Sequence, residues 1–219
     1  LEHVNILMYN SHSNARELFD TTSKSYHNRS KGRVFSFSSL IFLRRNKIVN
    51  KFVKSISSIN GKALDFGMGP AVFCKPCIEK GFSYLGIDIS SKMVDEAIAQ
   101  KIPNAIFEVG DIDILPKYVN SMDLVLAIGL IDYLENPKEG INVLAKCVAN
   151  NGYLLLSFRN RYSLPTLLRD CTRRVSRYFS NTNEGGSDKA FFLNVNEHSF
   201  DFILELKPLL EKLNFIILK

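Results

Sequence analysis

The stretch KALDFGMGPAV, residues 62–72, decides the fold, because it joins a short apolar strand to a glycine turn. Backbone N–H groups at such a strand-to-helix turn attract phosphate, so this pattern usually indicates a dinucleotide site. Here Gly67 and Gly69 are present, but Val72 stands where the GxGxxG fingerprint requires its third glycine. Asp65, which lies two residues before Gly67, would also repel a pyrophosphate. The turn therefore favours a ligand with a positively charged head and no phosphate.

Strands and helices alternate after this turn, which predicts an α/β fold with a doubly wound, mostly parallel sheet. We expect strands at residues 63–66, 83–87, 106–109, 122–128 and 153–158. Helices are expected at residues 71–80, from Ser90 or Ser91 onward, and at 138–148, with a turn at 150–152 before the fifth strand. A helix at 200–213 with Ser199 as its cap and a last strand at 215–218 complete the pattern.

Small or acidic residues mark the ends of the first four predicted strands. They are Asp65, Asp88, Asp111 and Gly129. In an open α/β sheet, ligands bind at the carboxyl ends of the strands. We therefore expect these four residues to converge on one crevice.

The composition is that of a soluble globular protein with one structural domain: 219 residues, 46% hydrophobic and 23% charged. No apolar run approaches the roughly 18 residues of a membrane span, and the N-terminus lacks the apolar stretch of a signal peptide. These observations predict a cytoplasmic protein without an integral membrane segment. Of the four cysteines, two have CxxC spacing, but no second pair and no His pair accompany them. We expect free thiols and no metal site.

Basic residues gather in both flanks of the chain. Residues 1–60 hold 10 basic and 3 acidic residues, 61–158 hold 8 and 12, and 159–219 hold 10 and 7. Six arginines alternate with apolar residues between 159 and 183. Such a segment can contact a membrane surface or an anionic or amphiphilic substrate, and it can equally be a cover with a solvated basic face. The first 55 residues are predicted to be helical, with residues 40–53 packing on the sheet.

Four stretches within residues 61–158 form one joint pattern: LDFGMGPA, YLGIDIS, FEVGDI, and LVLAIGLIDYLENP followed by NGYLLLSF. Together they resemble the class I S-adenosylmethionine (SAM)-dependent methyltransferases, in particular small-molecule O- and N-methyltransferases of the ubiquinone type. The lead-in LFDTTSKSYHNR resembles the FDxxAxxY segment of related enzymes, with Ser23 in place of Ala. The resemblance implies a Rossmann-like SAM-binding domain at 56–219, a helical cover at 1–55 and a basic substrate-side insertion at 159–198.

The resemblance also assigns roles at the methionine end of SAM. Backbone at Asp65, Gly67 and Gly69 would hold this end, because glycines allow a close approach. The backbone at Ile128, after the fourth strand, would bind the methionine amine. Arg45 would pair with the methionine carboxylate.

At the nucleoside end, Asp88 would accept hydrogen bonds from both ribose hydroxyls, since a carboxylate has two oxygens suited to a diol. Ile89 and Ile112 would sandwich the adenine, and Asp111 would accept from its amino group. Tyr26, in the lead-in, would close over the cofactor.

The sequence departs from the family at three points. Ala71 replaces the glycine common at the end of the first motif, which a turn tolerates if φ is negative there. Tyr133 stands where many relatives carry His. The sequence ends directly after the last predicted strand, before the antiparallel seventh strand of the family: either the chain is truncated there, or a sheet edge is left open to pairing.

The leading hypothesis is methyl transfer from SAM to an O or N atom of a small molecule by in-line displacement, with S-adenosylhomocysteine (SAH) as product. Holding donor and acceptor in line supplies most of such catalysis, so no strong acid or base is required. Asp132, Tyr133, His27 and His198 are candidate proton acceptors. One alternative is methylation of RNA or protein, which the basic flanks suggest, although no NPPY-like motif or aromatic platform supports nucleic acid as a partner. Another alternative is a SAM-binding regulatory domain without catalysis.

Overall fold

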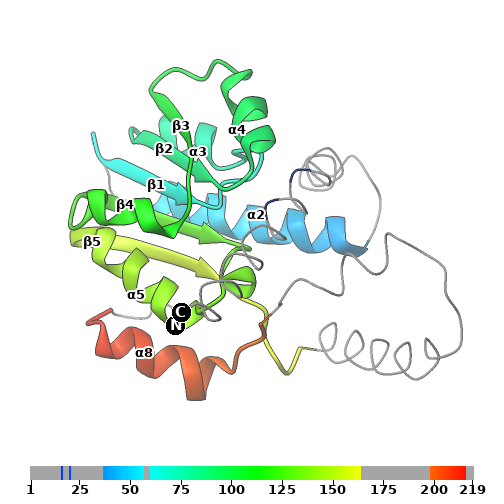
Figure 1. The fold of residues 1–219 in the computed structure, drawn as a ribbon, viewed down its shortest axis with the longest axis vertical. Helices are drawn as coiled ribbons and strands as arrows, with labels where there is room; N and C mark the ends of the chain where they lie inside the picture. The colour runs from blue at the N-terminus through cyan, green and yellow to red at the C-terminus, as the bar shows by residue number, and fades with distance from the viewer. Residues whose placement is uncertain (1–15, 17–19, 21–36, 57–59, 164–197, 216–219) are drawn as a thin grey trace, which may run out of the picture.

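The computed structural model describes residues 16, 20, 37–56, 60–163 and 198–215. Five parallel strands form one sheet in the order β3-β2-β1-β4-β5. The strands are β1 (Lys62–Phe66), β2 (Ser83–Asp88), β3 (Ala105–Val109), β4 (Met122–Ile128) and β5 (Val148–Ser157). The chain starts in the middle of the sheet, winds to one edge and then returns to the other, so the predicted doubly wound α/β fold is confirmed (Figure 1).

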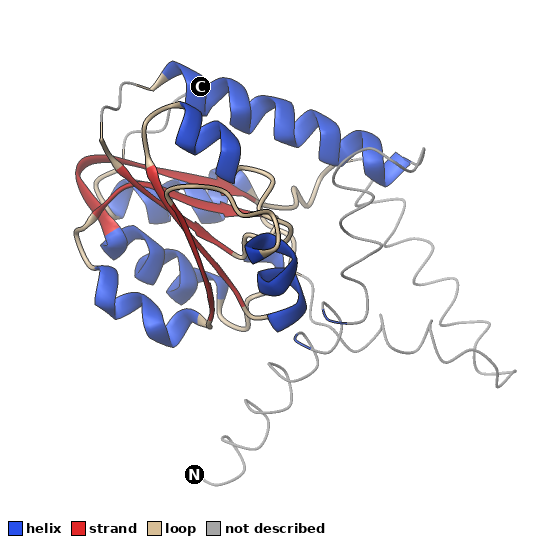
Figure 2. Cartoon of the chain, turned by 90° about the horizontal axis from the view of Figure 1, so that it is seen from above, coloured by secondary structure: helices blue, strands red, loops and turns tan. Residues whose placement is uncertain are grey.

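Helices cover both faces of the sheet, as Figure 2 shows. One face packs against α2 (Phe37–Ser55), α3 (Cys74–Glu79) and α4 (Ser91–Ile98). The other packs against the 3-10 helix η1 (Ile112–Tyr118), α5 (Pro137–Cys147) and α8 (Lys207–Lys212). Two short elements, η2 (Ile131–Tyr133) and the π-helix η3 (Phe202–Leu206), complete the description. The strand β4 is buried along most of its length, as expected for a central parallel strand covered twice.

Two element boundaries differ from the prediction. Helix α3 begins at Cys74 and not at residue 71, because Ala71 has a positive φ of 51° and cannot belong to a right-handed helix. Pro76 is tolerated because it lies in the first turn, where its missing N–H has no partner to lose. The predicted turn at 150–152 lies inside β5, where a register shift against β4 and a positive φ at Asn151 absorb the extra residues.

The C-terminal helical region starts later than predicted. Phe200 forms an isolated parallel bridge with Asn160 beyond the end of β5, so the chain is still extended there. Asp201 is the cap, and its side chain accepts from the N–H groups of Ile203 and Leu204. Ser199 is therefore not the cap. Most of the last predicted strand, residues 216–218, lies outside the described residues.

Three of the cysteines behave as predicted. Cys74, Cys77 and Cys147 are free and buried, whereas Cys171 lies outside the described residues. Burial raises the pKa of Cys74 to about 12 and that of Cys147 to about 11, so both thiols keep their protons. They act as small hydrophobic side chains in the two cores.

Candidate functional site

The glycine turn after β1 is held against the end of β2 by backbone hydrogen bonds. The N–H groups of Gly67 and Met68 donate to the carbonyl of Ile87, at 2.8 and 3.2 Å. Gly67 and Gly69 both have positive φ, 72° and 52°, a conformation that strongly favours glycine. A Cβ on Gly67 would lie 2.9 Å from Cδ1 of Leu130, so the loop after β4 closes over the turn. The two motifs thus meet at one edge of the sheet.

Ala71 adopts the left-handed conformation that its non-glycine side chain disfavours. Its φ is 51°, so the expected negative φ is wrong. The turn imposes this geometry: Ala71 donates its N–H to the carbonyl of Met68, and its own carbonyl accepts from Cys74. Its methyl group is buried in the core under the turn, which offsets part of the backbone strain.

Asp88, at the end of β2, is bound to the glycine turn. Its Oδ2 accepts from the N–H of Gly69 at 2.8 Å, and its Oδ1 accepts from the N–H of Ser90 at 2.9 Å. Burial raises the pKa of Asp88, while these two N–H groups act in the opposite direction. The backbone N–H of Ile89 also acts on this carboxylate. A carboxylate can accept about four hydrogen bonds, so Asp88 retains acceptor capacity for a ligand hydroxyl.

Asp20, from the N-terminal lead-in, also lies at this end of the sheet. Oδ1 of Asp20 accepts a hydrogen bond of 2.5 Å from the hydroxyl of Ser90, which also caps α4. Asp20 was not among the predicted site residues, although it is the acid of the LFDTTSKSYHNR segment. Tyr26 and His27 lie outside the described residues, so their predicted roles stay predictions.

The ends of β2 and β3 are joined at Gly110, whose N–H donates to the carbonyl of Asp88 at 3.0 Å. Asp111 follows, and its Oδ1 accepts from the N–H of Ile112 at 2.6 Å while capping η1. Ile89 and Ile112 are half-buried, and each follows the end of its strand. The structure thus brings the predicted nucleoside residues to one edge of the sheet.

Arg45, from α2, reaches the end of β4. Gly129 has a φ of 74°, and a Cβ there would collide with Nη1 of Arg45. The N–H of Gly129 donates to the hydroxyl of Ser157 at 2.7 Å, which ties β4 to β5 beside the buried Ile128. Nε of Arg45 is buried without a hydrogen-bond partner. A buried donor without a partner requires an explanation, and an anionic ligand group would supply one.

Asp65 is enclosed beneath the glycine turn. Its Oδ2 accepts a hydrogen bond of 2.6 Å from the hydroxyl of Tyr84, and only 1% of its surface is exposed. Burial raises the pKa of Asp65 to about 7, while the Tyr84 hydroxyl and the more distant Arg45 lower it. Asp88 raises it further.

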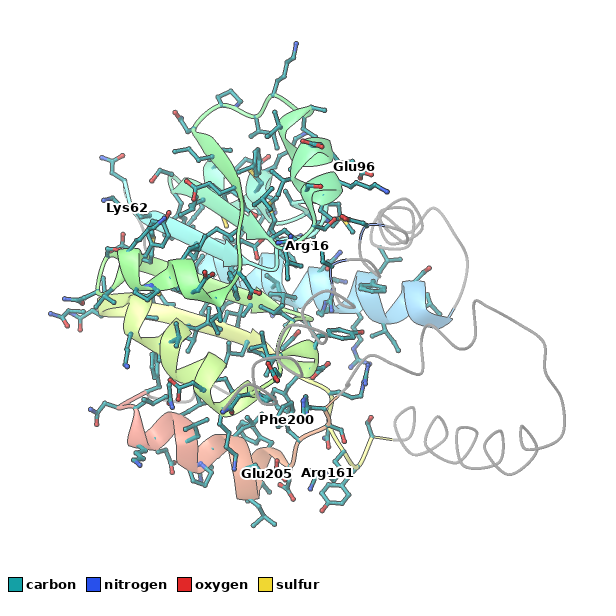
Figure 3. All side chains as sticks on the ribbon, in the orientation of Figure 1. Arg16, Lys62, Glu96, Arg161, Phe200 and Glu205 are labelled. Carbon is teal, nitrogen blue, oxygen red and sulfur yellow. The ribbon has the colours of Figure 1, made fainter. Side chains whose placement is uncertain are left out.

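Asp132 organises the chain on the far side of the site. Its Oδ1 accepts from the N–H of Arg159 at 2.8 Å, and its carbonyl accepts from the N–H of His198 at 2.7 Å. Below this junction Arg161 and Glu205 form an ion pair of 2.8 Å, and Phe200 lies nearby (Figure 3). Tyr133 is half-buried on η2, and Nε2 of His198 is buried without a hydrogen-bond partner. The acidic side chain of Asp132 thus has a structural partner.

The described part of the chain holds neither a cluster of metal ligands nor a helix that could span a membrane. Within residues 37–56, 60–163 and 198–215, no three His, Cys, Asp or Glu side chains gather in a way that could hold a metal ion. Among the helices that the structure describes, none is long and apolar enough to cross a membrane.

The fold and this site define a class I methyltransferase domain. Residues 38–218 match the family described as "Methyltransferase domain", so the chain belongs to that family. The predicted class, a SAM-dependent methyltransferase domain, is confirmed. A curated relative, the ubiquinone biosynthesis O-methyltransferase of Coxiella burnetii, is 26% identical over 120 residues, which are 53% of this chain and 51% of the relative. The chain thus spans about half the length of the curated relatives it matches.

Solved structures support the same fold. The magnesium protoporphyrin IX methyltransferase of Synechocystis PCC 6803, solved with bound SAH, has a TM-score of 0.69 at 20% identity and covers 94% of this chain and 90% of its own. A SAM-dependent methyltransferase of Thermotoga maritima, described as a possible histamine N-methyltransferase, has a TM-score of 0.64 at 17% identity, with coverage of 92% and 81%. At these identities the likeness concerns the fold.

Proposed function

We propose that this chain transfers a methyl group from SAM to an O or N atom of a small molecule. The observation that carries the proposal is the meeting of four strand ends at one edge, with Asp88 and Arg45 as their charged groups. When bound, SAM supplies a methyl group activated by its sulfonium. The curated relative that matches over 120 residues is named as a ubiquinone biosynthesis O-methyltransferase, which supports this acceptor class.

The residues suit SAM because each end of the ligand finds a matching group. Gly67 and Gly69 leave room for the methionine chain. The unpartnered Nε of Arg45 can donate a hydrogen bond to the methionine carboxylate. Asp88 has lone pairs left for the ribose diol, and Ile89, Asp111 and Ile112 are placed for the adenine. Ile128 offers backbone at the methionine amine.

The chain's contribution to the reaction is mainly to hold donor and acceptor in line. The acceptor subsite would lie beyond Gly129, between the loop after β4 and the segment that begins at Arg159. Arg161 is paired with Glu205, but residues 159–219 hold 10 basic and 7 acidic residues in total, and this excess of positive charge favours an anionic or amphiphilic acceptor. Tyr133 is one candidate proton acceptor there. Asp132 is a weaker one, because its carboxylate already accepts the backbone N–H of Arg159.

Calorimetric titration with SAM and SAH tests the cofactor. Asp88→Ala and the milder Asp88→Asn should each weaken binding by about tenfold or more, since a hydrogen bond to a charged group contributes about 1.5–3 kcal/mol. Asp95→Ala, at an exposed acid of α4, is the matched control and should bind normally. Folded wild-type protein that binds neither ligand would overturn the proposal.

The acceptor class needs a second experiment. SAH formation is measured with panels of phenols, carboxylic acids and amines, and in parallel with RNA and protein substrates. Turnover of a small molecule supports the proposal. Turnover of RNA or protein alone would contradict the acceptor class, and tight SAM binding without any turnover would favour a regulatory domain.

A further inference from the structure

A buried pair lies beneath the glycine turn: the phenol of Tyr84 on β2 and the carboxylate of Asp65 on β1. Ala63 is the register partner of Tyr84, so the hydroxyl reaches diagonally across the two strands to Asp65. The oxygen–oxygen distance is 2.6 Å, and the two residues are 2% and 1% exposed. Such a short distance is typical of a hydroxyl that donates to an ionised oxygen. The Tyr84 hydroxyl therefore stabilises an ionised Asp65 at a position that is almost completely buried.

Titratable groups face Asp65 from β2, α2 and α3, whereas its partner on β4 is the apolar Leu126. Tyr84 and Asp88 come from β2, Arg45 from α2, and Cys74 and Cys77 from α3. Burial raises the pKa of both thiols and that of Tyr84, so these groups stay neutral, and Asp88 is already bound by two backbone N–H groups. Among the described residues, the favourable partners of an Asp65 anion are thus the Tyr84 hydroxyl and the Arg45 cation.

Arg45 connects this pair to the ligand side. Its guanidinium lies against Gly129 at the end of β4, and its Nε has no hydrogen-bond partner. The Asp65 anion and the Arg45 cation therefore lie close enough to interact electrostatically, at the adjacent ends of β1 and β4. An amino acid head has the complementary pair, an ammonium and a carboxylate.

We propose that Tyr84 is a positioning residue for the methionine end of SAM: it holds Asp65 as an anion beside Arg45, so that the ammonium and the carboxylate each meet an opposite charge. This inference rests on the proposed function and adds to it a condition on the charge state of Asp65. The buried carboxylate attracts the ammonium through the electrostatic field of the site, in which low polarity makes charges interact strongly.

The proposal has a consequence for pH. Burial raises the pKa of Asp65 to about 7, so the free protein loses the anion as the pH falls below that value. An ammonium binds better to the site with the anion than to the neutral one. The affinity for the amino acid head should therefore be full at about pH 8 and fall by up to about tenfold at about pH 6, where about a tenth of Asp65 is ionised.

Comparing the binding of two ligands distinguishes the contribution of the methionine end from that of the nucleoside. SAH has an ammonium and a carboxylate, whereas 5′-methylthioadenosine has the same nucleoside and thioether without the amino acid head. Titration calorimetry from about pH 5.5 to about pH 8 should show the pH dependence for SAH. For 5′-methylthioadenosine the affinity should change by less than about twofold over the same range.

Tyr84→Phe removes the hydroxyl and keeps the ring. Without this donor the anion of Asp65 is less stable, so the midpoint of SAH binding should move upward by about one pH unit or more. A purely structural role would weaken SAH equally at every pH. Tyr118→Phe is the matched control, because it also removes a bond from tyrosine to a carboxylate, that of Glu108 at 3.2 Å, at a site away from the turn. Asp65→Asn, which keeps an acceptor for Tyr84, should abolish the pH dependence.

The outcomes separate this inference from the function it rests on. Failure of folded wild-type protein to bind SAH at any pH would overturn both. Normal SAH binding that does not vary with pH, or an unshifted midpoint in Tyr84→Phe, would overturn the positioning role alone. If Tyr84→Phe does not fold, Asp65→Asn decides: an unchanged pH profile in that variant contradicts the proposal, and a flat profile supports it.

Discussion

Gly129 is a residue at which one added methyl group tests the geometry of the site. Its φ of 74° is strained for any side chain, and a Cβ there would displace the guanidinium of Arg45. We expect Gly129→Ala to lose about 1 kcal/mol of stability and about tenfold in SAH affinity. Gly81→Ala, at a positive φ of 97° outside the site, should lose stability alone. Thermal unfolding and calorimetry measure both effects, and unchanged SAH affinity in Gly129→Ala would place Arg45 outside the site.

The buried carboxylate of Asp65 predicts how stability depends on pH. Its pKa is about 7 in the folded chain and about 4 in an unfolded one, so the folded state prefers the proton. This contribution to stability is complete below about pH 4 and is lost as the pH rises through about 7. In Asp65→Asn this position does not titrate, so the variant does not lose this stability as the pH rises. Its melting temperature relative to wild type should therefore rise between about pH 5 and pH 8, by a few degrees for each kcal/mol. A difference that stays constant with pH would contradict the assignment.

Several site residues could be predicted from their positions alone, because the end of a strand is visible in the sequence. Asp88 and Asp111 lie at strand ends as predicted. The bond between Tyr84 and Asp65 could not be predicted, since it depends on the register of β1 against β2. The contact of Asp20 with Ser90 joins residues 70 positions apart in the sequence. Only the family lead-in gave a signal for it.

At the scale of elements, two residues are candidates for the N-terminal cap of η3: Ser199 and Asp201. The sequence favoured Ser199, but Asp201 accepts from the N–H groups of Ile203 and Leu204 at 2.9 and 3.0 Å. Asp201→Ala should cost about 1 kcal/mol, because two backbone N–H groups at the helix start lose their capping acceptor. Ser199→Ala should change stability by less than about 0.5 kcal/mol. Denaturant unfolding of the two variants measures this difference, and the reverse order would restore the sequence-based cap.

Most elements were predictable because their hydrophobic pattern decides them. The strand β4 was predicted at its observed bounds, since a run of apolar residues buried on both faces has little ambiguity. The start of α3 and the turn inside β5 were misplaced. At Ala71 the packing of the turn imposes a positive φ that an alanine disfavours, whereas Asn151 tolerates a positive φ and its place inside β5 follows from the register against β4.

At the scale of the whole molecule, two sheet faces and two cores converge on a single edge. The core that contains Tyr84, Cys74 and Cys77 supports the glycine turn from one side. The core that contains Ile131 and Phe200 supports the loop after β4 from the other. The residues proposed to contact the methyl donor are thus held in place by the two buried cores.

A ligand held by several strand ends should stabilise the molecule as a unit. Ligand at about 100 times its dissociation constant adds about 2.7 kcal/mol to the free energy of unfolding. For a domain of this size, each kcal/mol raises the melting temperature by about 2–4 °C, so saturating SAH should raise it by about 5–10 °C. Scanning calorimetry measures this shift, and Asp88→Ala at the same SAH concentration should show a much smaller one. An equal shift in the variant would mean that SAH binds elsewhere, because Asp88 joins the glycine turn to α4 at the centre of the proposed site.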